Sequence, residues 1–182
     1  MAARGVGAIY TRTSMGDMLR APPDPAPRKC LLDRWYWPHH SKVERAVNDV
    51  LARLGCCLII DCHSFPSVAL PYELDQTGQR ADFCVGTDSF HTPSFVRDAI
   101  VAAAKEEDYS IAVDTPFAGA LVPLAFYRND RRVWSVMIEV NRRLYMDEHS
   151  GAKGPGFEQV SGVLGRLIVA AAETAARADQ RP

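Results

Sequence analysis

The chain has 182 residues, enough for one domain with a full-sized core. Apolar residues make up 47% and charged residues 24%, with 21 Lys and Arg against 22 Asp and Glu. A net charge this close to zero excludes the basic excess that nucleic-acid-binding surfaces need. No apolar stretch approaches the length of a membrane span, so we expect neither a nucleic acid nor a membrane as partner.

The five cysteines indicate reduced thiols and not a disulfide framework, because their number is odd and two of them are adjacent. No CxxC pair suggests a structural zinc site, and Cys62 is expected to face the core. The first residues, MAARGVGAIY, lack the layout of a signal peptide. These features predict a cytoplasmic protein.

The first third of the chain predicts a short strand, a loop and a helix. Residues 6–11 (VGAIYT) have the composition of a strand, and the proline-rich residues 21–27 (APPDPAP) predict an irregular surface loop. Residues 41–54 place apolar side chains on one helical face, and Gly55 marks the end of that helix.

The remaining chain alternates apolar strands with helices. Strands are predicted at residues 56–61, 81–86, 109–114 and 133–140, and helices from Thr92-Pro93 to about residue 107 and from Phe157 to the alanine-rich end. This alternation predicts an α/β fold with a mixed, largely parallel sheet and helices on both faces.

Two polar residues at predicted strand ends are the first candidates for chemistry. His63 follows a buried strand, where an imidazole can serve as metal ligand, general base or hydrogen-bonded structural residue. Glu139 lies near the end of the apolar run VWSVMIEV, and a buried carboxylate needs a cation, a hydrogen-bond donor or a proton. Glu139 is therefore either a general base in a cleft or the partner of a nearby arginine.

Other polar residues are candidates for support. Arg142 can bind a carboxylate of a ligand or of the protein, and Asp61 and Asp82 can orient His63 or an arginine or cap their strands. His40 suggests structural packing or a substrate contact, whereas Ser64 lacks the glycine-flanked elbow of a hydrolase nucleophile. Two further histidines, His91 and His149, are expected in solvent-side loops.

The order of five motifs resembles that of the N-formylglutamate amidohydrolase family, which belongs to the zinc-carboxypeptidase-like hydrolases. These motifs are YWPHH, IIDCHSFPS, RADFCVGTD, DTPFAGA and MIEVNRRLYMDE, and the similarity extends from about Gly5 to the final helix. The resemblance implies a single domain over residues 1–182 that corresponds to the C-terminal two-thirds of the family fold.

The resemblance also implies a reaction: zinc-assisted hydrolysis of N-formyl-L-glutamate to formate and L-glutamate, a step of histidine degradation. In that comparison His63 matches a zinc ligand and Glu139 the residue that takes the proton of the attacking water. Asn141 and Arg142 match a stretch that helps to bind the substrate, with Asp61, Ser64, His40 and Asp82 as supporting residues. The expected ligand is a small acidic N-acylated amino acid.

The family's N-terminal segment, which carries the other zinc ligands, has no counterpart in the motifs found here. We therefore expect the chain to depend on such a segment as a partner or to self-associate. The alternative is a non-catalytic binding protein on the same scaffold.

Overall fold

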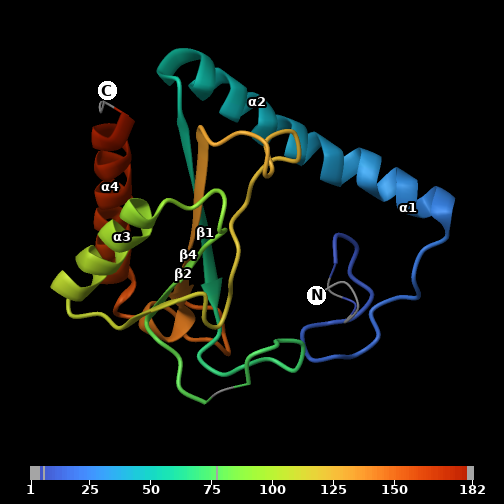
Figure 1. Cartoon of the computed structure of the whole chain (residues 1–182). Helices are drawn as coiled ribbons and strands as arrows, with labels where there is room; N and C mark the ends of the chain where they lie inside the picture. The colour runs from blue at the N-terminus through green and yellow to red at the C-terminus, as the bar shows by residue number, and fades with distance from the viewer. Residues whose placement is uncertain (1–4, 6, 77, 180–182) are drawn as a thin grey trace.

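The computed structural model describes residues 5, 7–76 and 78–179. The elements, shown in Figure 1, are α1 Pro25–Leu31, η2 Leu32–Tyr36, α2 Trp37–Leu54, β1 Cys57–Phe65, β2 Phe83–Gly86, α3 Ser94–Glu106, β3 Ile111–Val113, β4 Val133–Asn141, η3 Arg142–Leu144 and α4 Phe157–Asp179. Among these residues, no helix combines the length and the apolar character that crossing a membrane requires.

Four strands form one sheet in the order β1-β4-β2-β3. The pairs β1–β4 and β2–β3 are parallel, whereas β2 runs antiparallel to β4. The predicted mixed α/β sheet is therefore confirmed. Since β2 runs in the opposite direction, its amino end meets the carboxyl ends of β1 and β4 at one end of the sheet.

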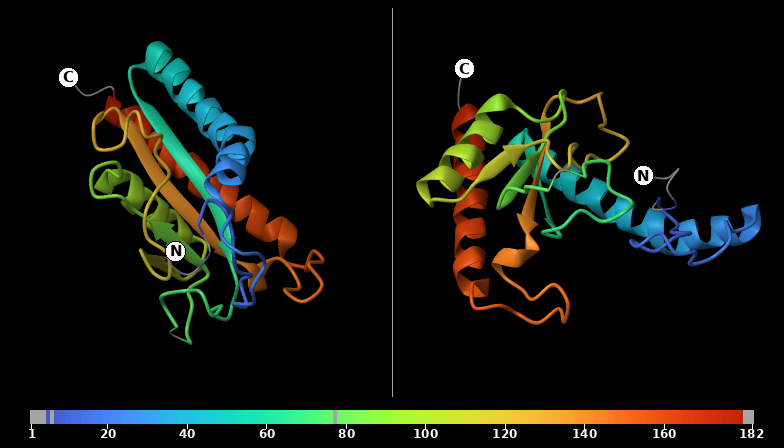
Figure 2. Two further views of the ribbon diagram at one scale, coloured as in Figure 1. Left: turned by 90° about the vertical axis from the view of Figure 1, so that its right-hand side faces the viewer. Right: turned by 90° about the horizontal axis from the view of Figure 1, so that it is seen from below.

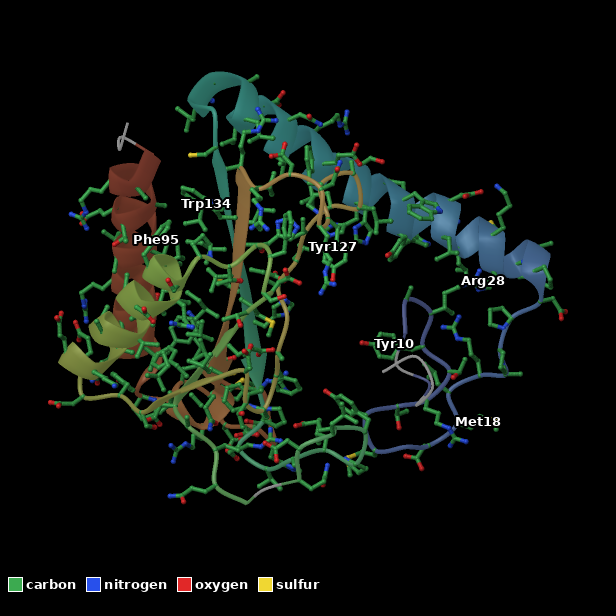
Figure 3. The ribbon with its side chains drawn as sticks, in the orientation of Figure 1. Tyr10, Met18, Arg28, Phe95, Tyr127 and Trp134 are labelled. Carbon is green, nitrogen blue, oxygen red and sulfur yellow. The ribbon has the colours of Figure 1, made fainter. Side chains whose placement is uncertain are left out.

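Helices cover both faces of this sheet (Figures 1 and 2). The larger core joins α3 and α4 to one face, where the Phe95 ring also packs edge-on against Trp134 of β4, with ring centroids 5.5 Å apart (Figure 3). The smaller core joins α2 to the other face through Val47, Cys57 and Val133. The smaller core covers only the amino-terminal part of β1 and β4, which leaves their carboxyl ends on that face to other segments.

The helix before β1 begins earlier than the sequence predicts. Residues 25–27, expected in a loop, form the start of α1, and α1, η2 and α2 follow one another without interruption. Pro25 is tolerated because the first turn of a helix has no intrahelical acceptor for its backbone N–H groups. The helix ends as predicted at Gly55, whose φ of 76° is left-handed.

Three further local predictions are wrong. Residues 7–11 of the predicted first strand form no strand, since Tyr10 takes part only in an isolated bridge; residue 6 lies outside the described residues. Cys62 is exposed and not in the core. His91 is fully buried, and burial of its ring is tolerated because Nδ1 donates to Val133 O at 2.7 Å and Nε2 accepts from the Arg128 N–H at 2.8 Å.

We expect His91→Ala to lower the free energy of unfolding by about 2–4 kcal/mol, because it removes both hydrogen bonds and leaves a cavity. Urea titration followed by circular dichroism measures the change. His149→Ala is the matched control, since His149 is exposed and its removal should change stability by less than about 0.5 kcal/mol. Equal stability of the two variants would contradict the structural role of His91.

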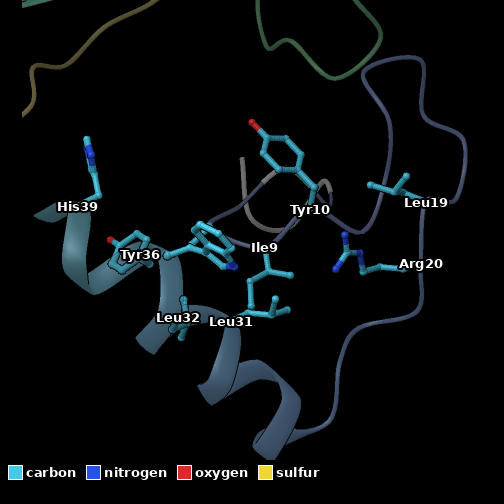
Figure 4. Close-up of a pocket in the computed structure, with 10 residues that line it drawn as sticks. Ile9, Tyr10, Leu19, Arg20, Leu31, Leu32, Tyr36 and His39 are labelled. Carbon is cyan, nitrogen blue, oxygen red and sulfur yellow. The ribbon is translucent and has the colours of Figure 1, made fainter.

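The N-terminal segment and the first helix expose a group of apolar side chains. They surround a hollow of about 510 Å³ (Figure 4), and the Trp35 side chain beside it is 64% exposed. Exposed apolar surface of this kind favours association between proteins.

We expect the chain to self-associate with rising concentration through this surface, and sedimentation velocity measures it. The double variant Leu19→Ser/Trp35→Ser should shift the distribution toward monomer. Leu54→Ser, which removes an exposed leucine at the far end of α2, should leave it unchanged. A monomeric wild-type chain across the concentration range would contradict the expectation.

Candidate active site at the carboxyl end of the sheet

Strand register sets three titratable side chains in one row. His63 of β1 lies opposite Glu139 of β4, and Glu139 lies opposite Cys84 of β2. Directly paired residues point to the same face of a sheet. On this face α2 covers only the amino-terminal parts of β1 and β4, so the row lies beyond the area that α2 covers.

The side chain of His63 is oriented by its neighbour on the same strand. Asp61 and His63 are two residues apart and share a face, and His63 Nε2 lies 2.9 Å from Asp61 Oδ2. With Nε2 at the carboxylate, Nδ1 is the ring nitrogen left to contact a ligand. An imidazole held by a carboxylate in this way is the usual arrangement of a metal-bound histidine.

Glu139 is a buried carboxylate with an unsatisfied oxygen. The residue is 7% exposed, and within the described part of the chain its Oε2 has no hydrogen-bond partner. Burial raises the pKa of Glu139 to about 7, although the positive charges of His63 and Arg142 partly oppose the shift. A carboxylate that exchanges its proton near neutral pH and has a free oxygen suits proton transfer to and from a reactant.

Neither the thiol of Cys84 nor the hydroxyl of Ser64 is activated as a nucleophile. Burial raises the pKa of Cys84 to about 11, so its thiol stays protonated, and its Sγ donates to Phe117 O at 3.3 Å. Ser64 Oγ accepts a hydrogen bond from Arg142 Nε at 3.1 Å, and Arg142 Nη2 donates to Ser64 O at 3.1 Å. Arg142 thus ties η3 to the end of β1, while its charge acts on Glu139.

The remaining predicted residues lie in two other places. Asn141 is buried, donates to Ala81 O at 3.1 Å, and accepts from the Arg143 N–H, so its amide joins β4 to the start of β2. Asp82 pairs with Arg143 and not with His63. His40 lies on α2 with its ring 4.1 Å from that of Tyr36, centroid to centroid.

The described residues do not make up a complete zinc site. A catalytic zinc has about three protein ligands, and nowhere among residues 5, 7–76 and 78–179 do three His, Cys, Asp or Glu side chains gather closely enough. The Asp61–His63 pair fits one ligand position, but the set as a whole does not fit the metal.

A buried ion pair that sequence reasoning missed lies beside the site. Glu73 and Arg80, both buried, pair within the loop that follows β1. Arg80 Nη1 also donates to Pro66 O at 3.0 Å, and Glu73 Oε1 accepts from the Leu70 N–H at 3.0 Å. Glu73 and Arg80 lie in a loop, where the sequence has no helical or strand periodicity, so nothing in it indicates that they are buried.

A small hollow of about 190 Å³ lies beside His63 and Ser64, against the first turns of α4. In the part of the chain that the structure describes, no lysine or arginine lines it.

The fold matches that of two solved structures. The crystal structure of N-formylglutamate amidohydrolase from Ralstonia eutropha JMP134 matches with a TM-score of 0.76 and 24% identity over 94% of this chain and 62% of that one. A gene product of Agrobacterium tumefaciens matches with a TM-score of 0.66 and 18% identity over 92% and 62% of the two chains. The present chain thus spans less than two thirds of the length of either structure.

The family follows from the sequence match. The model of the N-formylglutamate amidohydrolase family matches residues 1–146, which is most of the chain. The chain belongs to this family. No curated protein matches it.

We expect Glu139→Gln to stabilise the fold at pH 8 by about 2–3 kcal/mol and to have little effect near pH 4.5. Folding raises the pKa of this carboxyl, so its contribution to stability is fully present at a pH below its pKa in the unfolded chain. The contribution is lost as the pH rises through about 7, the pKa in the folded chain. Urea unfolding at both pH values measures the difference. Glu106→Gln, at an exposed glutamate on α3, is the control, and an equal effect at both pH values would contradict the burial of Glu139.

Proposed function

We propose that the chain carries the hydrolytic site for the formyl amide of N-formyl-L-glutamate, with Glu139 as general base. The observation that supports this most directly is the buried Glu139, whose Oε2 has no hydrogen-bond partner among the described residues and whose pKa is raised by burial to about 7. Membership of the amidohydrolase family and the fold of the Ralstonia protein support the reaction class.

The proposed role of Glu139 is to move one proton twice. Its ionised carboxylate takes a proton from a water molecule, whose oxygen adds to the formyl carbon. The proton then passes to the amine nitrogen as the C–N bond breaks, which releases formate and L-glutamate. General base catalysis of this kind contributes about 10²–10⁴ in rate.

Within the proposal, His63 is the one residue assigned as a zinc ligand. With Nε2 held by Asp61, Nδ1 would be the ligand atom, and a bound zinc would supply a more acidic water. The described residues provide no complete ligand set, so the other ligands would have to come from elsewhere.

The test is formate release from N-formyl-L-glutamate by the purified chain, with and without added zinc, together with metal analysis. We expect kcat/KM to rise with pH through about 7 as Glu139 loses its proton. Glu139→Gln should lower the rate by about 10²-fold or more, and Glu106→Gln should not. Zinc at one per chain would support His63 as ligand, whereas no formate under any condition would favour a binding protein on this scaffold.

A further inference from the structure

A polar cavity of about 680 Å³ opens at the same end of the sheet, toward β3. Its lining comes from the loop after β1, the start of β3 and the end of β4, and includes two arginines, Arg80 and Arg143. Among the described residues, the lining of the hollow beside His63 includes neither lysine nor arginine, so the two cavities differ in the ligand charge they can accept.

Arg143 presents a pre-oriented guanidinium to this cavity. Its side chain is 51% exposed, and its Nη2 donates to Asp82 Oδ1. The other oxygen of Asp82 accepts from the Ser110 N–H at 3.0 Å and from the Ser110 hydroxyl at 2.6 Å. Because Asp82 is held on both sides, it fixes Arg143, which keeps further N–H groups for a bidentate contact with an anion.

Arg80 contributes a buried positive charge to the lining of the cavity. Its side chain is 3% exposed, and it is bound to Glu73 and to Pro66 O, yet its Nε has no partner within the described residues. A buried N–H of a charged group is costly to leave unsatisfied. Because this Nε is itself buried, Arg80 acts on the cavity through its charge and not through a direct hydrogen bond.

The cavity lies at a suitable distance from Glu139. Asn141, which lines it, is two residues from Glu139 on the same face of β4, so their Cα atoms are about 7 Å apart. This separation is of the order of the length of a glutamate side chain. A ligand with its amide at Glu139 could therefore place its side-chain carboxylate in the cavity.

We propose that this cavity binds the side-chain carboxylate of an acidic N-acyl amino acid, with Arg143 as the specificity-determining residue and Arg80 as its buried support. The assignment rests on the proposed function. It also moves carboxylate recognition away from Arg142, whose Nε and Nη2 are both engaged by Ser64.

The test is isothermal titration of the metal-free chain, in EDTA, with L-glutamate and with L-glutamine, which lacks the side-chain charge. We expect saturable glutamate binding and at least about tenfold weaker glutamine binding, since a charged hydrogen bond is involved. Arg143→Gln should weaken glutamate binding by at least about tenfold and leave glutamine binding unchanged, and Arg143→Lys should restore part of the loss.

Arg166→Gln is the matched control, because Arg166 is 56% exposed and also paired with a carboxylate, that of Glu107, but lies on α4. It should bind glutamate like the wild type, and circular dichroism should show that both variants are folded. Unchanged glutamate binding by Arg143→Gln, equal binding of glutamine and glutamate, or no saturable binding would each overturn the assignment. Glutamate binding without formate release would instead count against the proposed function alone.

Discussion

The parallel pairing of β1 with β4 is the constraint on which the candidate site depends. It sets His63 directly beside Glu139, and it brings the carboxyl ends of both strands to one end of the sheet. A shift of one residue in this register would turn Glu139 toward the face covered by α3 and α4, into an apolar core. Residues with no chemical role, such as Val133 and Cys57, therefore control the site through their packing under α2.

Burial of Glu139 links the stability of the fold to its chemistry. The carboxylate lacks a partner for Oε2 among the described residues, and the positive charges nearby do not fully offset its desolvation. Such a group costs free energy at neutral pH, and it persists because the surrounding strands hold it in place. The same desolvation is what makes the carboxylate basic enough to accept a proton from water.

The sequence allowed the parts that follow from periodicity and strand ends to be predicted. The apolar run VWSVMIEV predicted both the central strand β4 and the anomaly of Glu139, whereas His63, expected after a strand over residues 56–61, lies within β1, which continues to Phe65. The register between β1 and β4 could not be predicted, because apolar runs on both strands are compatible with several alignments. The first predicted strand failed for a related reason: a short apolar segment becomes a strand only where a neighbouring strand pairs with it.

Long-range ion pairs could not be predicted from the sequence for a different reason. Asp82 and Arg143 are 61 positions apart, and nothing in their local surroundings indicates that antiparallel β2 will bring them together. Arg142 and Arg143 are adjacent and alike in sequence, yet the structure gives them separate tasks, because in η3 the first reaches back to Ser64 of β1 and the second reaches Asp82 before β2. One arginine is used to fasten β1, and the other is left at a cavity with its charge oriented by Asp82. Which arginine of such a pair can recognise a ligand is decided by the hydrogen bonds that the fold has already made, and not by the motif in which both occur.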